Sequence, residues 1–133
     1  AQYFQHLTGL RFWNHICVSD GVTDAVSTSL ERYMDLISMR QKLVSSNIAN
    51  ADTPGYKTQD IDFQASLKSL LDGGSPQQGE VQGLAVKNDG NNVDLDREAQ
   101  LLSENALRFS VASSLMKMQL QSIRSAIKEG ANA

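Results

Sequence analysis

The chain has 133 residues, enough for one domain or for a smaller folded part with long helices. It contains 12 Lys and Arg residues against 15 Asp and Glu residues, which gives a formal net charge of −3. This mild acidity gives no reason to expect nucleic acid or an anionic membrane surface as a partner. The single cysteine, Cys17, excludes an internal disulfide and therefore a disulfide-stabilised secreted domain.

The N-terminal residues 1–21 form an atypical leader. This segment holds Cys17, the only tryptophan and both histidines. Its opening sequence, AQYFQHLTGLRFW, lacks a basic region followed by an apolar stretch and a cleavage site, so we do not expect a cleaved signal peptide. No apolar run in the chain approaches the ~20 residues of a membrane-spanning helix. If the protein leaves the cytoplasm, its export route does not depend on such signals.

Residues 22–49 are predicted to form the first long helix. Large apolar side chains recur at helical spacing, and Arg40 interrupts the stripe that they form. The stripe consists of Val26, Leu30, Tyr33, Ile37, Val44 and Ile48. Asp20, Thr23 and Thr28 are alternative residues at which this helix begins.

Residues 50–93 are predicted to form a turn-rich connecting lobe, because they contain both prolines and most of the glycines. The sequence TPGY at residues 53–56 suits a type II turn, since proline presets φ and glycine accepts the positive φ that follows. Apolar residues are spaced through 63–71. Residues 72–83 are predicted to be a flexible loop or hairpin, and residues 84–86 a short strand.

Residues 94–129 carry the clearest helical signal. Asp94 is a favourable N-cap, and more than four heptad repeats of apolar residues follow it. These residues, called the apolar stripe below, are Leu95, Ala99, Leu102, Ala106, Phe109, Ser113, Met116, Leu120, Ile123 and Ile127. A helix of this length measures roughly 50 Å at about 1.5 Å per residue.

The apolar stripe requires a partner. Full burial of its seven large side chains would contribute roughly 10–20 kcal/mol. Ordering the helix costs on the order of 1–2 kcal/mol per residue in backbone entropy, which exceeds that gain. The first helix is the nearest partner. The expected fold is therefore mainly α, with long N- and C-terminal helices pairing as an antiparallel coiled coil and joined by a small Gly/Pro-rich irregular or β-containing lobe.

Further apolar residues lie outside both stripes. Such a second apolar face predicts contact with additional helices, from other copies of the chain or from relatives. A small helical bundle closed by residues 1–21 is the alternative. The residues outside the stripes are Leu36, Met39, Leu43, Leu107, Val111, Leu115 and Met118.

No residue pattern typical of catalysis occurs. His6, His15 and Cys17 lack a fourth ligand and the paired spacing of zinc sites. The acidic run 89–98 does not fit an EF-hand, because its glycine follows the first acid directly. We therefore expect no enzyme, cofactor, metal ion or small-molecule substrate. A helical adaptor or export-chaperone-like binding module is one alternative to an assembling structural protein, and a small hydrolase is another.

The segment SSNIANADTPGYK, residues 45–57, resembles the motif shared by bacterial flagellar rod and hook proteins. DIDFQASL at 60–67, DGNNVDLDRE at 89–98 and the short middle region are similar to the proximal rod proteins of this axial family. The resemblance spans about residues 22–129. Residues 1–21 depart from it, and an expression-derived leader, a start site assigned too far upstream and a genuine extension all remain open.

The resemblance implies a structural subunit of the flagellar basal-body rod, which works by assembly. The implied partners are copies of the chain, other rod proteins and the flagellar type III export apparatus. The implied location is the rod that crosses the periplasm, reached without a cleaved signal peptide. The terminal helices are expected to pair and to form the wall of a tube through Leu30, Tyr33, Ile37, Val44, Ile48, Leu102, Phe109, Met116, Leu120, Ile123 and Ile127.

The resemblance also singles out a signature turn, which consists of Asn47, Asn50, Thr53, Pro54, Gly55 and Tyr56. We expect Asn47 and Asn50 to cap the helix end, because Asn tolerates the left-handed conformation and bonds nearby backbone. Pro54 and Gly55 would fix the direction in which the chain leaves the helix, and Tyr56 would anchor the turn. An ordinary turn in a monomer is the alternative.

Overall fold

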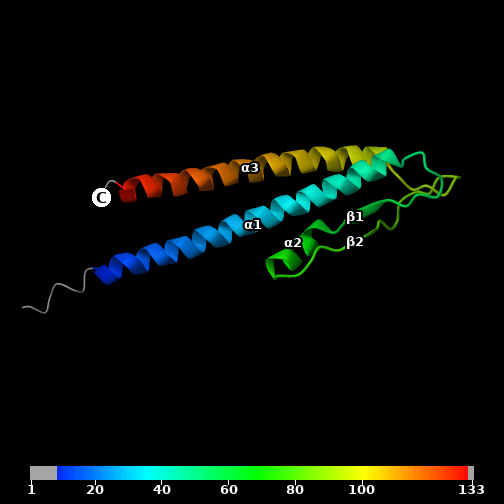
Figure 1. Cartoon of the computed structure of the whole chain (residues 1–133). Helices are drawn as coiled ribbons and strands as arrows, with labels where there is room; N and C mark the ends of the chain where they lie inside the picture. Colours follow the sequence, from blue (N-terminus) through cyan, green and yellow to red (C-terminus); the bar gives the residue numbers. More distant parts are fainter. Residues whose placement is uncertain (1–8, 132–133) are drawn as a thin grey trace, which may run out of the picture.

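Two long helices dominate the structure, a computed structural model that describes residues 9–131, with side chains described from Asp24 onward. They are α1 (Gly9–Ala49) and α3 (Leu95–Ala131). The two helices run in opposite directions, contact one another near the end of α1 and separate toward their other ends (Figure 1). The chain is thus mainly helical, as expected. A coiled-coil pairing of α1 with α3 is not confirmed.

The connecting lobe lies along α1 on the side away from α3 (Figure 1). It contains β1 (Gln59–Ile61), α2 (Phe63–Leu71) and β2 (Gln78–Glu80). The two strands pair antiparallel, with Gln59 opposite Glu80 and Ile61 opposite Gln78. The expected β-containing lobe therefore has a two-stranded sheet and one short helix.

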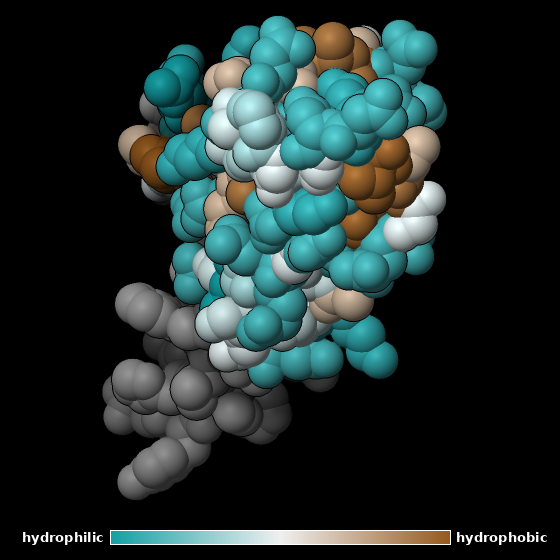
Figure 2. All heavy atoms as spheres, turned by 90° about the vertical axis from the view of Figure 1, so that its right-hand side faces the viewer, coloured by the Kyte–Doolittle hydropathy of each residue, from teal (hydrophilic) through white to brown (hydrophobic). Residues whose placement is uncertain are grey.

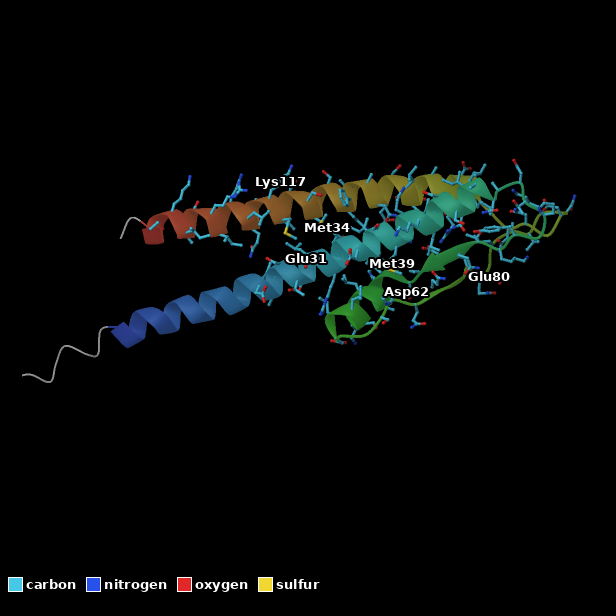
Figure 3. The ribbon with its side chains drawn as sticks, in the orientation of Figure 1. Glu31, Met34, Met39, Asp62, Glu80 and Lys117 are labelled. Carbon is cyan, nitrogen blue, oxygen red and sulfur yellow. The ribbon has the colours of Figure 1, made fainter. Side chains whose placement is uncertain are left out.

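Helix α2 begins at an N-cap. The side chain of Asp62 accepts a hydrogen bond from the backbone N–H of Ala65 at 3.0 Å, which satisfies a donor that the first helical turn leaves free. In Figure 3, Asp62 lies at the start of α2. Apolar residues at helical spacing then face α1, so this short helix closes the small core.

The core lies between α1 and the lobe, and it contains Phe63. The ring of Phe63 meets Tyr33 edge to face, with 5.6 Å between centroids, and the guanidinium of Arg108 lies 4.3 Å from the Phe63 centroid. The remaining buried members of this core are Leu36, Ile37 and Ile61. Leu36 is fully buried, although the sequence placed it outside the main stripe.

Two boundaries differ from the sequence-based prediction. Helix α1 begins at Gly9 and not near residue 22, because residues 9–21 contain no proline and a glycine such as Gly21 costs a helix only about 1 kcal/mol. Strand β2 occupies residues 78–80 and not 84–86. Its position is set by pairing with β1, and the backbone bond from Val81 N to Thr58 O at 2.9 Å continues the ladder.

Hydrophobic surface lies mainly along the length of the molecule. Viewed from the end at which α1 turns into the lobe, the atoms are mostly hydrophilic, and hydrophobic residues gather on the flanks (Figure 2). In the part of the chain that the structure describes, no helix is both long and apolar enough to cross a bilayer. Exposed apolar patches commonly mark surfaces that contact other proteins, so the exposed apolar residues of the long helices are candidates for such contacts.

Candidate functional site

The apolar stripe of α3 is mostly exposed. Leu102, Phe109 and Leu120 are each between 40% and 49% exposed. The residues that α3 buries lie on a neighbouring line, rotated by roughly a quarter turn at about 100° per residue. These buried residues are Glu98, Leu101, Asn105 and Ala112. The α1–α3 contact is therefore made by a more polar line of side chains than the sequence predicted.

The other expected assembly residues differ in their burial. Of the α1 residues, Ile37 and Val44 are buried, Leu30 and Tyr33 are half-buried, and Ile48 is 38% exposed. On α3, Met116 and Ile123 are half-buried and Ile127 is exposed, and the second apolar face is exposed at Leu107, Val111, Leu115 and Met118.

A groove of about 310 Å³ lies between α1 and α3. Ile37 of α1 and Leu102 and Phe109 of α3 line it, together with polar side chains that include Gln41 and Asn105. Asn105 is 2% exposed, and its Oδ1 has no hydrogen-bond partner among the described residues. An apolar groove next to an acceptor without a hydrogen-bond partner is typical of a surface that contacts another protein, such as a further helix.

A second groove, of about 540 Å³, lies between α1 and α2. Val26, Leu30 and Tyr33 line it from α1, and Leu67 and Leu71 line it from α2. It is shallow and almost entirely apolar. Both grooves therefore border α1, the first on its side facing α3 and the second on its side facing α2.

The signature turn directly follows α1, which ends at Ala49. The side chain of Asn50 donates to the carbonyl of Ser46 at 2.8 Å, and Tyr56 N donates to the carbonyl of Thr53 at 3.2 Å. Gly55 has φ of 74°, as the third position of a type II turn requires. No non-glycine residue among those described has positive φ, so Asn50 bonds the backbone at the end of α1 as expected but without the left-handed conformation.

Asn47 does not cap the helix but joins three elements. It is 1% exposed and lies in the last turn of α1. Its Nδ2 donates to the Gln59 carbonyl at 2.8 Å and to Glu98 Oε2 at 3.0 Å, while its Oδ1 accepts from Gln59 N and from the Tyr56 hydroxyl, each at 3.1 Å. One side chain thus fixes β1, α3 and the signature turn relative to α1.

The loop of residues 87–93 hydrogen-bonds to the signature turn. Asn91 is fully buried, and its Nδ2 donates to the carbonyls of Asn50 at 2.9 Å and Thr53 at 2.8 Å. Gly55 N donates to the carbonyl of Asp89 at 2.9 Å. The sequence singled out both segments through their resemblance to rod proteins, but not their contact, because a hydrogen bond across about 40 residues leaves no local pattern.

A mostly buried carboxylate of β1, that of Asp60, pairs with two guanidinium groups. Arg40 Nε lies 3.0 Å from its Oδ1, and an Arg97 nitrogen lies 2.6 Å from its Oδ2. Burial alone would raise the pKa of Asp60, but hydrogen bonds from Arg40, Ile61 N and Arg97 together hold that pKa below its ordinary value of 3.8. The only sequence signal was Arg40, which interrupts the apolar stripe of the first helix.

Arg40, Asp60, Arg97 and Glu98 form a polar cluster that links α1, β1 and α3. Its members bond one another, and Arg97 also reaches Glu98 Oε1 at 2.5 Å. Among the side chains that the structure describes, no three His, Cys, Asp or Glu residues are grouped as a metal site. The hypotheses involving His6, His15 and Cys17 concern side chains outside the described set.

Known proteins match the chain along most of its length. A family model described as "Flagella basal body rod protein" matches residues 37–57, which include the end of α1 and the signature turn. The flagellar basal body rod protein FlgB of Escherichia coli (strain K12) is 30% identical, with 80% of this chain and 96% of the relative covered. FlgB of Salmonella typhimurium is 29% identical with the same coverage, and FlgB of Borrelia hermsii is 30% identical with 73% and 91% covered.

Proposed function

The chain belongs to the FlgB family of flagellar basal body rod proteins and is a structural subunit of the rod, and we propose that it assembles through the open faces of α1 and α3. The observation that carries this proposal is the exposure of the apolar stripe, whose large side chains repeat with heptad spacing. Copies of the chain and other rod proteins cover these faces in the rod. There, α1 and α3 pair as an antiparallel coiled coil whose seam neighbouring helices complete.

Covering these apolar faces contributes to ordering the helices. Leu102, Phe109 and Leu120 are each about half exposed, so covering them contributes roughly 1 kcal/mol per side chain. The second apolar face adds four similar residues. Summed over both faces, the gain offsets a substantial part of the conformational entropy that the separated ends of the helices lose.

The signature turn sets the direction of the lobe relative to the helices. Asn47, Asn50 and Thr53 bond backbone and side chains around the turn, while Pro54 and Gly55 lie exposed at the tip. We propose that this exposed tip contacts an adjacent subunit. A fixed turn would hold that contact in one orientation, because the lobe has little freedom to swing.

The small core suits export before assembly. A chain whose long helices gain much of their burial from neighbours is readily kept unfolded during transport. We propose passage through the flagellar type III export apparatus without signal cleavage, and incorporation into the rod where it crosses the periplasm. The role requires no catalytic step, cofactor or small-molecule substrate.

Complementation of a deletion strain tests the proposal. Leu120→Asp places a charge on the apolar stripe and should abolish rod growth and swimming. Ser110→Asp, an exposed change on the same helix but outside both the stripe and the second apolar face, should preserve swimming. Normal swimming of the Leu120→Asp strain, with the variant present at the wild-type level, would contradict the proposal.

A further inference from the structure

One face of α1 carries a line of exposed carboxylates. Asp24 and Glu31 are seven residues apart, and Asp35 extends the line by one turn. None of these three makes an ion pair with a described residue. Within the described part of the chain, this acidic line is therefore without partners of opposite charge.

Helix α3 carries a matching line of exposed basic groups. Lys117 and Arg124 are also seven residues apart, and Lys128 extends their line by one turn. None is paired with a described carboxylate. Figure 3 shows Lys117 on the side of α3 that points away from α1, so Glu31 and Lys117 do not meet within one chain.

The basic line borders the apolar stripe. Leu120 lies three residues after Lys117 and four before Arg124, so all three occupy one surface of α3. Leu120 is 49% exposed. A helix that covers this surface would bury Leu120 and meet both basic groups at its edge.

Two contacts fix how α1 and α3 are aligned along their length. Asn47 bonds Glu98 at 3.0 Å, and Asn105 contacts Gln41 at 3.4 Å. By continuation along both helices, Asp24 lies level with about residue 121 of α3, at 1.5 Å per residue. The acidic and basic lines therefore occupy the same level of the molecule, on different helices.

We propose that a second copy of the chain lies alongside the first in the same direction, with its α1 against the basic line of α3. Glu31 and Asp24 of one copy then pair with Lys117 and Arg124 of the other. Because both lines have the same seven-residue spacing, an axial shift of about 4.5 Å, three residues along a helix, aligns both pairs together. This arrangement rests on the proposed rod function and assigns which faces of neighbouring copies meet.

The ion pairs set direction and alignment, while apolar burial provides most of the attraction. Exposed ion pairs contribute little each and are weakened by salt. A reversed neighbour would separate acids from bases, and like charges would oppose it. The arrangement repeats from copy to copy, because each chain offers one acidic and one basic line on different faces.

Cysteine cross-linking tests the contact at high concentration of the full chain. In a Cys17→Ser background, Thr28→Cys lies between the two acids and Gln121→Cys lies between the two bases. Mixing these two single-cysteine preparations under oxidising conditions should give a disulfide-linked heterodimer. The matched control is Ser122→Cys, which is only one residue further but about 100° around the helix, and should cross-link at least tenfold less.

Charge reversal provides a second, independent measurement. Lys117→Glu with Arg124→Glu should raise the concentration of half-maximal association about tenfold at low salt, and less at high salt. Adding Asp24→Lys with Glu31→Lys to the same chain should restore association. All four positions are exposed, so folding is preserved, and circular dichroism verifies this.

The outcomes separate this inference from the rod function. Equal cross-linking of Gln121→Cys and Ser122→Cys, lack of restoration by the second pair of reversals, or a wild-type chain that stays monomeric at every concentration would each overturn the side-by-side contact. The rod function is tested separately, by swimming of the complemented strain, and does not depend on these outcomes.

Discussion

Asn47 Nδ2 lies 3.0 Å from Glu98 Oε2, and neither side chain is more than 1% exposed. This hydrogen bond joins α1 to α3 at the end where the two helices contact. A buried carboxylate is stable only when it is paired and hydrogen-bonded, and here Arg97 supplies the charge and Asn47 the second donor. The contact between the long helices thus depends on a polar anchor.

Asn47→Ala should lower the free energy of unfolding by about 2–4 kcal/mol, because a hydrogen bond to a charged group is lost and Glu98 stays buried. Urea denaturation followed by circular dichroism measures the change. Ser45→Ala, an exposed substitution two residues away, should change the same quantity by less than about 0.5 kcal/mol. Equal stabilities of the two variants would contradict the role of Asn47.

Asp60 should make stability depend on pH. Its pKa is lower in the folded chain than in the unfolded chain, so its ionised form stabilises the fold above pH of about 4 and this contribution is lost as pH falls through the folded pKa. Asp60→Asn, which resembles the protonated acid, should be less stable than wild type at pH 7. The difference should shrink toward zero well below pH 3.8. A difference that is constant with pH would refute this assignment.

Local patterns predicted the helices and the turn at Pro54 and Gly55, because helical spacing and positive φ are properties of short segments. They did not predict which face of α3 meets α1. The heptad pattern pointed to Leu102 and Phe109, whereas the chain buries Glu98 and Asn105. The hydrogen bond that joins Glu98 to α1 comes from Asn47, far away in the sequence, and apolar periodicity carries no information about such a polar partner.

The strand β2 illustrates the same limit. Leu84 to Val86 has the apolar composition of a strand, but Gln78 to Glu80 pairs with β1 because the chain returns through α2 and lies beside it. Arg40 gave a partial signal, since a charged residue within an apolar stripe requires a partner. The partner, Asp60, was not identifiable without the fold.

Gly55→Ala should lower the free energy of unfolding by about 1–2 kcal/mol, since an alanine at φ of 74° is strained. An added Cβ at Gly55 meets nothing within 4 Å, so the loss comes from backbone conformation alone. Gly79→Ala is the matched control, because the space there is also open and its φ is not positive. Thermal unfolding distinguishes them, and a loss of the same size in both variants would argue against a strained turn.

Asn91→Ala should loosen the signature turn. The substitution removes two hydrogen bonds to the carbonyls of Asn50 and Thr53, so the amide of Gly55 should exchange with solvent faster. Hydrogen exchange by NMR or mass spectrometry detects this change. Asn88→Ala, at an exposed neighbouring position, should leave the exchange rate unchanged. If the Gly55 amide were equally protected in the Asn91→Ala variant, the signature turn would not depend on the hydrogen bonds of Asn91.

Chemical labelling of the apolar stripe tests most directly whether other subunits cover it. With Cys17→Ser and Leu120→Cys in a strain that still swims, a maleimide reagent should label the isolated chain rapidly, because Leu120 is 49% exposed. In purified basal bodies, labelling at this position should be at least tenfold slower, as expected for a side chain buried between helices. Equal labelling of the free chain and the assembled rod would contradict assembly through this face of α3.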